Sequence, residues 1–301
     1  MPLCRLCPRN CGVDRINAKG YCGGGMKASV AHVMLHMWEE PCISGSNGSG
    51  AVFFSGCQLK CVYCQNREIS HGKIASGTEK TPRELADIFL HLRDEGAHNI
   101  NLVTPDHYAV QIKEAAGIAK SLGLDIPFVY NCSGYVNPST LQMIDFVDIY
   151  LVDFKYMDDN LAERYSSCHG YADAAKAAVA EMVRQRPVPA FDKAGMMTGG
   201  VIVRHLVIPG CADDSKRIIE YLFGTYGDTI YISLMNQFTP VGLEEFPEIN
   251  RRLTTLEYKR LVEYAKLLGI NNAYVQERAA ADKNFIPDFG FRISDFGLNK
   301  K

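Results

Sequence analysis

Three cysteines, Cys57, Cys61 and Cys64, lie within one short stretch that reads Cys-Gln-Leu-Lys-Cys-Val-Tyr-Cys. Thiolates at this C-x3-C-x2-C spacing can converge on one face of an iron–sulfur cube and bind three of its four irons. The fourth iron then stays open to a ligand that is not a protein thiolate. An open iron allows chemistry, whereas a cluster with four protein ligands only passes electrons. The alternatives are a zinc knuckle and three buried thiols that happen to be neighbours.

A second set of cysteines lies at the start of the chain, at Cys4, Cys7, Cys11 and Cys22. Four thiolates suffice for a tetrahedral metal site, and C-x2-C is the usual spacing for zinc. The first three cysteines also have a spacing typical of a cluster, so zinc, a second [4Fe–4S] cluster and free thiols all remain alternatives. Either metal would fold a segment that is too small to hold a core by itself.

The distribution of cysteines along the chain indicates a reducing compartment. Of the 11 cysteines, 8 lie in the first 64 residues, and the total is odd. The first residues, Met-Pro-Leu-Cys-Arg, lack the apolar stretch of a secretory signal. A secreted disulfide framework is therefore not expected in a chain of this length, and a cytoplasmic location is predicted.

The overall composition is that of a globular protein. The chain has 301 residues, of which 47% are hydrophobic and 22% are charged. Its 32 basic and 34 acidic residues give a net charge of -2. The chain therefore lacks the excess of basic residues that is typical of a nucleic-acid binder. No apolar run approaches the roughly 20 residues that span a bilayer, so neither nucleic acid nor a membrane is expected as a partner.

Alternating strands and helices are predicted to position the cysteines. The first strand, at 51–54, ends just before Cys57, and capping boxes at Thr81–Glu84 and Thr254–Glu257 start two of the helices. The other strands are predicted at 99–103, 126–130, 147–154, 201–208, 230–234 and, as a short last strand, 273–275. Helices between strands at this spacing indicate βαβ units and a parallel sheet, so six such units suggest an open or closed barrel. Its chemistry is expected at the carboxyl ends of the strands.

Four parts of the chain are predicted from these patterns. They are a cysteine-rich metal-binding segment at 1–26, a connecting segment at 27–50, the barrel at 51–276 and a tail at 277–301 that packs on the barrel.

The cysteine motif and its surroundings resemble a known family. A C-x3-C-x2-C motif directly after the first strand of a repeated βα domain, with Tyr63 before the last cysteine, resembles the signature of the radical S-adenosylmethionine (SAM) enzymes over residues 51 to about 240. The lead-in Glu39–Gly45, which reads Glu-Glu-Pro-Cys-Ile-Ser-Gly, resembles that of the pyruvate formate-lyase activating enzyme-like branch. The resemblance implies a partial (β/α)6 barrel and a [4Fe–4S] cluster at the three cysteines. It also implies SAM at the open iron, where one electron cleaves the sulfonium and a 5′-deoxyadenosyl radical abstracts hydrogen.

The resemblance also implies cofactor contacts near the strand ends. Lys155 suits the carboxylate of SAM and Asp153 a hydroxyl or amine, since the pair resembles the D-x-K of activating enzymes. At the second strand, Val103-Thr104-Pro105 stands where the family usually has Gly-Gly-Glu. The full set of candidate contacts is Tyr63, Thr104, Asn131, Ser133, Asp153, Lys155 and His205. A strand histidine such as His205 is as readily a satisfied core residue.

The predicted function is a radical SAM oxidoreductase that acts like a glycyl-radical activase on a protein substrate. The resemblance further implies an electron donor such as flavodoxin or ferredoxin. One alternative is the radical modification of a small molecule or a peptide. Another is a non-catalytic iron–sulfur or zinc protein for electron transfer, which the open three-cysteine set makes less favourable.

Overall fold

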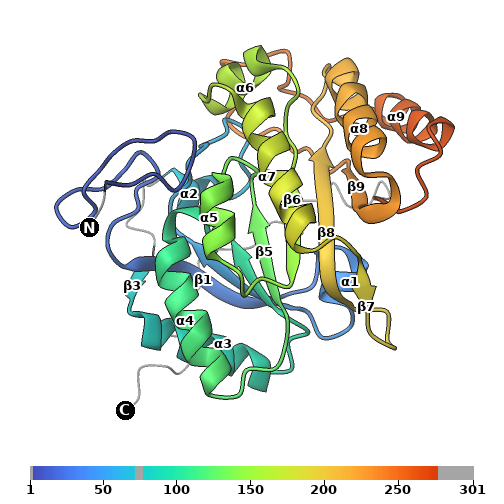
Figure 1. The fold of residues 1–301 in the computed structure, drawn as a ribbon. Helices are drawn as coiled ribbons and strands as arrows, with labels where there is room; N and C mark the ends of the chain where they lie inside the picture. The colour runs from blue at the N-terminus through green and yellow to red at the C-terminus, as the bar shows by residue number, and fades with distance from the viewer. Residues whose placement is uncertain (1–2, 72–76, 277–301) are drawn as a thin grey trace.

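The computed structural model describes residues 3–71 and 77–276 and is built around one curved sheet (Figure 1). Seven strands of this sheet run parallel, in the order β2 (Ser49–Phe54), β4 (Ile100–Val103), β5 (Phe128–Cys132), β6 (Ile149–Asp153), β8 (Met197–Leu206), β9 (Tyr231–Met235) and β10 (Ala273–Val275). The sheet runs from β3 (Thr78–Lys80) to β10, and these two edges do not pair in the described part of the chain. The predicted α/β partial barrel is therefore confirmed.

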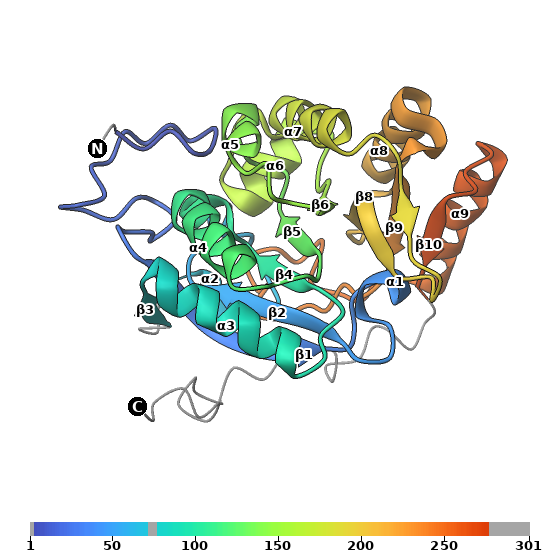
Figure 2. The ribbon, with the colours of Figure 1, turned by 60° about the horizontal axis from the view of Figure 1, so that its bottom comes forward.

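Helices cover the convex face of the sheet (Figure 2). They are α3 (Pro82–Asp94), α4 (Ala109–Ser121), α5 (Pro138–Met143), α7 (Tyr171–Gln185), α8 (Ala212–Tyr226) and α9 (Thr255–Leu267), with α6 (Asp159–Ser166) following β6. Both predicted capping boxes are present: Thr81 and Glu84 cap α3, and Thr254 and Glu257 cap α9. Each box satisfies two amide groups that would otherwise lack a partner at the start of the helix.

The segment 27–50, expected only to connect, adds structure to the sheet. Its strand β1 (Ala28–His36) pairs antiparallel with β2 on one side and with β3 on the other. The short helix α1 (Pro41–Ser44) follows, with Pro41 in its first turn. The remaining short elements are α2 (Arg67–Ser70), β7 (Ala190–Phe191) and the 3-10 turns at Asp106–Tyr108 and Gly227–Thr229.

The inward face of the barrel changes from apolar to polar along its strands. Near the amino ends, apolar side chains of β5, β6 and β8 pack with Cys42 and Ile43 of α1; they are Val129, Ile149, Leu151 and Ile202. Since alternate residues of a strand face the same side, later inward positions on these strands carry Asn131, Asp153 and Arg204. The fold thus collects polar groups at the carboxyl ends of the strands.

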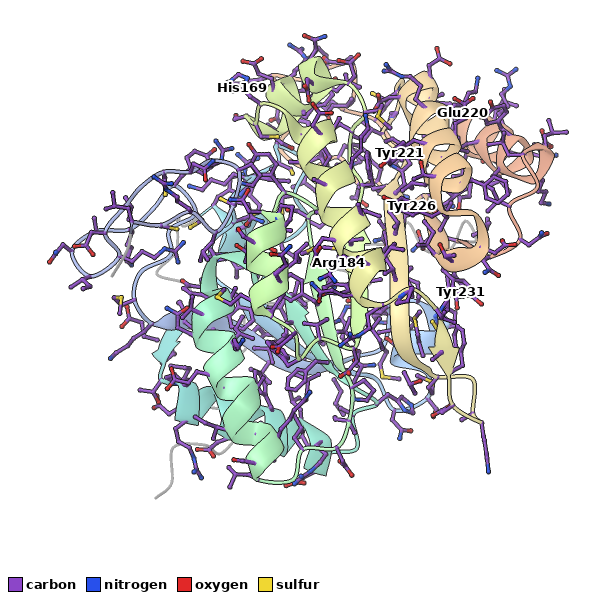
Figure 3. The ribbon with its side chains drawn as sticks, viewed as in Figure 1. His169, Arg184, Glu220, Tyr221, Tyr226 and Tyr231 are labelled. Carbon is purple, nitrogen blue, oxygen red and sulfur yellow. The ribbon has the colours of Figure 1, made fainter. Side chains whose placement is uncertain are left out.

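The outer layer is polar on its solvent side. Arg184 on α7 and Glu220 on α8 are exposed (Figure 3). Within residues 3–71 and 77–276, none of the helices combines the length and the apolar character that crossing a bilayer requires. The predicted tail at 277–301 lies outside the described residues.

Candidate active site

The three-cysteine loop follows β2 and faces a cavity of about 220 Å³. Cys57, Cys61 and Cys64 all line this cavity, which we call the strand-end cavity. Its wall includes residues at or just after the carboxyl ends of five parallel strands: Thr104, Asn131, Asp153, Leu206 and Met235. The loop and the strand ends therefore meet at one place, as in other parallel α/β folds.

Each sulfur of the loop accepts at least one hydrogen bond. The donors are the Leu59 amide to Cys57 (3.4 Å), the Ser70 hydroxyl to Cys64 (3.3 Å) and the Ser166 hydroxyl to Cys61 (2.9 Å). Such donors stabilise sulfur in its charged form, the form that binds metal. Burial raises the pKa of the Cys57 thiol to about 12 and also raises that of Cys64. Without a metal these thiols therefore stay neutral, and a bound metal would displace their protons.

This donor set fits the group that the spacing suggests. Three sulfurs face one cavity, and the Ser70 and Ser166 hydroxyls that reach them come from other parts of the chain. In the described residues, no three Cys, His, Asp or Glu side chains are grouped closely enough to hold a single metal ion.

A buried ion network forms part of the wall of the strand-end cavity. The Arg204 guanidinium donates to Asp153 (2.8 Å), to Glu39 (2.8 Å) and to the Asn131 side chain (2.6 Å). Asn131 in turn donates to Glu39 at 3.2 Å. The Arg204 side chain is only 12% exposed, so its charge depends on these partners. The network fixes the direction of every side chain that it contains.

Lys155 and Asp153 form the second part of this wall. Lys155 Nζ donates to Asp153 at 2.7 Å. Burial opposes the ionisation of Asp153, but the charges of Arg204 and Lys155 outweigh it, so the pKa of this carboxyl lies below its ordinary value. Burial likewise opposes the charge on Lys155, yet the neighbouring Asp153 carboxylate raises the pKa of the amine. The cavity thus holds a permanent ammonium beside the cysteines.

The other predicted contacts lie in the same cavity, with one exception. Tyr63, Thr104, Asn131 and Ser133 line it together with Asp153 and Lys155. Thr104 has a φ of +57°, which is strained for a β-branched residue, and its amide donates to the Asn131 carbonyl at 2.9 Å. The Tyr63 hydroxyl is bonded to that of Tyr156 at 2.6 Å, so its ring rather than its hydroxyl faces a ligand.

His205 does not fit the predicted cofactor contact. It lies between Arg204 and Leu206 on β8, both of which line the cavity, so its side chain points to the other face of the strand. One ring nitrogen contacts the Phe154 carbonyl and the other the Ser215 hydroxyl, each at 2.8 Å. Burial lowers the pKa of this imidazole to about 4. The structure places His205 as a satisfied core residue.

The four N-terminal cysteines lie in a segment without helix or strand. A turn closes at Cys7, where the Asn10 amide donates to the Cys7 carbonyl at 3.0 Å. The Cys22 sulfur accepts from the Gly24 amide at 3.4 Å and lies 3.7 Å from the Arg15 guanidinium. Burial raises the pKa of Cys7 to about 11, and the nearby Cys22 and Cys4 add to this. Amide and guanidinium groups directed at sulfur suit a thiolate ligand.

This segment docks directly on the three-cysteine loop. The Cys57 amide donates to the Cys22 carbonyl at 3.1 Å. Gly56, at a φ of +88°, makes the approach feasible, because a Cβ there would stand 2.0 Å from that carbonyl oxygen. The Arg9 guanidinium also donates to the Gln58 carbonyl. A direct backbone hydrogen bond thus links the two cysteine sets, in addition to the packing of the fold.

Sequence reasoning missed two charged residues of the cavity and two hydroxyls. Arg204 precedes His205 on the strand, and strand alternation assigns these neighbours to opposite faces. Glu39 belongs to the lead-in that carried a family resemblance, but its sequence position gives no sign that it reaches the cavity. Ser70 and Ser166 donate to the sulfurs. Ser166 is 105 residues from Cys61 in sequence, and no motif marks Ser70.

Comparison with known proteins identifies a family for most of the barrel. A scan of protein families matches residues 51–222 to the radical SAM superfamily. The chain is also 29% identical over 283 residues to an uncharacterized protein of Methanocaldococcus jannaschii, MJ0674. The matched region covers 90% of this chain and 76% of that protein.

Two solved structures are similar in fold. A radical SAM methyltransferase from Sphaerobacter thermophilus matches with a TM-score of 0.53 and 16% identity, over 76% of this chain and 66% of that one. SuiB from Streptococcus suis, crystallised with the precursor peptide SuiA, matches with a TM-score of 0.48 and 13% identity, over 73% of this chain. The chain spans 46% of the SuiB chain, so about half of that protein has no counterpart in the match.

Proposed function

The chain belongs to the radical SAM superfamily, and from that membership we propose that it is an activase-like enzyme that abstracts hydrogen from a protein substrate. Membership itself makes it a radical SAM enzyme that uses a [4Fe–4S] cluster and SAM. The observation that carries the proposal is the strand-end cavity, where three hydrogen-bonded sulfurs face Lys155 and Asp153.

The cluster would be held by Cys57, Cys61 and Cys64. When bound, it supplies the single electron that cleaves the sulfonium of SAM to a 5′-deoxyadenosyl radical. The chain's own part is to hold the thiolates with donors such as Ser70 and Ser166, and to keep water from a reactive radical. Both tasks are served by a pocket set within the strand ends rather than on the surface.

SAM is proposed to lie along the strand ends. The Lys155 ammonium is suited to its carboxylate, and Asp153 to a hydroxyl or the amino group. Asn131 and Ser133 are within the same cavity and can reach ribose or carboxylate oxygens. The backbone of Thr104, held in a strained turn, is proposed to receive the amino group in place of the family's usual Gly-Gly-Glu turn.

Two features support the activating-enzyme branch. The first is the Asp153–Lys155 pair, whose 2.7 Å contact faces the cavity as a cofactor-binding pair should. The second is the lead-in Glu39–Gly45, which does more than connect, because Glu39 bonds to Arg204 in the cavity wall. Both features that suggested the branch from sequence therefore contribute side chains to one site.

The N-terminal cysteines are proposed to hold a second metal centre. The hydrogen bonds directed at Cys22 and the turn at Cys7 support a thiolate site. Zinc and a second [4Fe–4S] cluster both suit four cysteines. In the described residues these sulfurs are not grouped tightly enough for a single ion, so zinc would have to draw them closer together. Metal analysis of protein purified without oxygen distinguishes them. When Cys57, Cys61 and Cys64 are all replaced by alanine, the metal that remains would be zinc in the first case and iron in the second.

The electron is proposed to come from a small acidic carrier such as flavodoxin or ferredoxin. Lys19, Lys27 and Lys60 line a surface cavity that also contacts Cys22 and Gly56. A cluster of lysines next to the cysteine loops is suited to steer an acidic partner toward them. Reduction by such a carrier should therefore slow as ionic strength rises.

One experiment tests the radical chemistry. The protein is reconstituted with iron and sulfide without oxygen, reduced, and given SAM, and 5′-deoxyadenosine is measured by liquid chromatography. We expect its formation in wild-type protein. A fully loaded cluster that yields no 5′-deoxyadenosine would overturn the proposed activity.

A second experiment tests the substrate class. Incubation with a glycyl radical enzyme is followed by electron paramagnetic resonance, where a glycyl radical on the partner protein supports an activase. The competing function is modification of a small molecule or peptide. It would be favoured if 5′-deoxyadenosine forms readily, no protein radical appears, and peptide or small-molecule products accumulate instead.

A further inference from the structure

A second cavity of about 260 Å³ adjoins the strand-end cavity. The two share wall residues, including Glu39, Arg204, Met235 and Gln237, so they are neighbours that these side chains separate. The second cavity extends away from the cysteines toward β9 and β10, and none of the three loop cysteines lines it. We call it the lateral cavity. Its position leaves the strand-end cavity to the cofactor and offers separate space to another molecule.

Glu40 lines the lateral cavity with a buried carboxyl group. The residue is only 8% exposed, and its Oε2 atom has no hydrogen-bond partner in the described structure. Glu40 stands at the start of α1, yet its side chain makes no capping bond to that helix. A buried carboxylate oxygen without a partner costs free energy, so a group of this kind calls for an explanation.

The charges around Glu40 do not balance it. All three donor groups of Arg204 are directed elsewhere, to Asp153, Glu39 and Asn131. Lys155 is engaged by Asp153. Within residues 3–71 and 77–276, the network therefore has two cations for its carboxylates at Asp153 and Glu39, and Glu40 is a third carboxyl group that no cation contacts directly. Glu39 adds to the effect of burial in raising the pKa of Glu40, while Arg204 opposes it.

We infer that the lateral cavity is a substrate subsite that binds an ammonium or guanidinium group, with Glu40 as its counter-ion. The location follows from the cavity and the unpartnered oxygen, and the assignment to substrate rests on the proposed function. For a protein substrate, the group would be a lysine or arginine side chain or an amino terminus. Binding it would pair the buried carboxylate and restore the missing positive charge.

The rest of the wall suits such a cation. The Ser233 hydroxyl is hydrogen-bonded to the Glu40 carboxyl group, and its oxygen can still accept from an ammonium group placed beside Glu40. The Tyr274 hydroxyl also lines the cavity and is hydrogen-bonded to Cys42. Trp38 lies at the rim, 57% exposed, and lines both cavities. Indole is the aromatic group that attracts cations most strongly, so it adds a second favourable contact.

Trp38 also makes the inference testable without any radical reaction. It is the only tryptophan of the chain, so its fluorescence reports on this rim alone. The probe is n-butylamine, which is cationic at neutral pH, and the matched probes are 1-butanol and butyrate, which are neutral and anionic. Each is titrated at constant ionic strength into full-length protein without SAM or reductant.

We expect saturable quenching by butylammonium and none by 1-butanol or butyrate at equal concentration. Glu40→Gln should weaken the apparent affinity by about tenfold or more, since it removes the buried charge but keeps the shape. The matched control is Glu245→Gln, which changes an exposed carboxylate outside both cavities and should leave the titration unchanged.

Other results would overturn the inference. They are tighter binding of butyrate than of butylammonium, equal responses to amine and alcohol, no saturable response, or unchanged affinity in Glu40→Gln. If Glu40→Gln does not fold, the three-probe comparison on wild-type protein still decides. Because no SAM cleavage is measured, a failed titration and a failed radical reaction remain separate findings.

Discussion

The molecule carries two cysteine-rich regions that touch but are built differently. The three-cysteine loop continues a buried strand, and Ser70 and Ser166 from outside the motif donate to its sulfurs. The four-cysteine segment has no helix or strand in residues 3–27. It is held by local turns and by a few bonds to the barrel, such as those from Asn137 and Thr140 to the Arg5 and Leu6 carbonyls.

The difference shows where each region obtains its shape. The loop packs against the barrel's hydrophobic core, so the core contributes to its shape. The segment has no helix or strand of its own, so its order depends on docking to the barrel and would be increased by the proposed metal. A substitution in the loop should therefore remove chemistry and leave the fold, whereas a substitution in the segment should loosen structure and leave chemistry.

The largest expected effect comes from replacing a single cysteine in each region and comparing the two variants. Cys61→Ala should lower 5′-deoxyadenosine formation by at least about 1,000-fold, because a cluster site with two thiolates no longer holds its metal. Cys11→Ser, in the exposed part of the segment, should lower it by less than about tenfold. The rate is measured by chromatography, and iron and zinc are counted in each variant.

An equal loss in both variants would contradict the comparison. It would mean that the segment and the loop form one catalytic unit. The thermal midpoint should show the reverse order, with Cys11→Ser lowering it more than Cys61→Ala does.

The next effect concerns the charge network of the barrel. Arg204→Met removes the cation that serves both Glu39 and Asp153, leaving two buried carboxylates without it. We expect a loss of about 3–5 kcal/mol in the free energy of unfolding, measured by urea denaturation. Arg83→Met is the matched control, because Arg83 pairs with Asp87 on α3 where both side chains are exposed, and its loss should cost less than about 1 kcal/mol. Similar losses in the two variants would show that the network adds nothing beyond a surface pair.

Much of the barrel was predictable because local patterns decide it. The capping boxes at Thr81 and Thr254, the apolar strands and the helices between them agree with one another and with the structure. The three cysteines of the loop were predictable from spacing alone, because one loop carries all of them. The placement of Glu39 was not, since it depends on how α1 packs under the strands, a long-range contact with no local signal.

His205 shows the same limit of prediction from sequence, here for a residue that was predicted to be in the site. The residue type and its strand suggested a ligand, but only the face of the strand decides between ligand and core. Neighbouring Arg204 takes the cavity face, so His205 takes the core face. The family resemblance pointed to this strand and could not choose between adjacent residues on it.

A smaller effect tests the joint between the two regions. Gly56→Ala places a Cβ 2.0 Å from the Cys22 carbonyl oxygen, at a φ of +88°. Gly96→Ala is the matched control, with a φ of +90° and no atom within 4 Å of the added Cβ. Both share the left-handed strain of about 1–2 kcal/mol. Gly56→Ala should cost about 1–2 kcal/mol more, because it also displaces the carbonyl that accepts the Cys57 amide.

The readout distinguishes undocking from unfolding. We expect maleimide to label the N-terminal cysteines of Gly56→Ala faster than those of Gly96→Ala, as followed by mass spectrometry. Equal labelling rates would mean that the segment stays docked without this backbone contact.

The last expected effect isolates the barrel by pH. His205 touches neither cysteine set, and burial lowers its pKa to about 4, whereas an unfolded histidine has a pKa near 6.5. As the pH falls below about 6.5, the unfolded chain takes up a proton that the folded chain refuses, so stability falls until the folded group also titrates near pH 4. Between pH 7.5 and 5, this residue should remove about 2 kcal/mol of stability. His205→Asn should show a shallower decline over that range in urea denaturation, whatever its stability at pH 7.5. If the two slopes coincide, the imidazole is not held neutral, and the strand face assigned to it would have to be abandoned together with the orientation of Arg204 beside it.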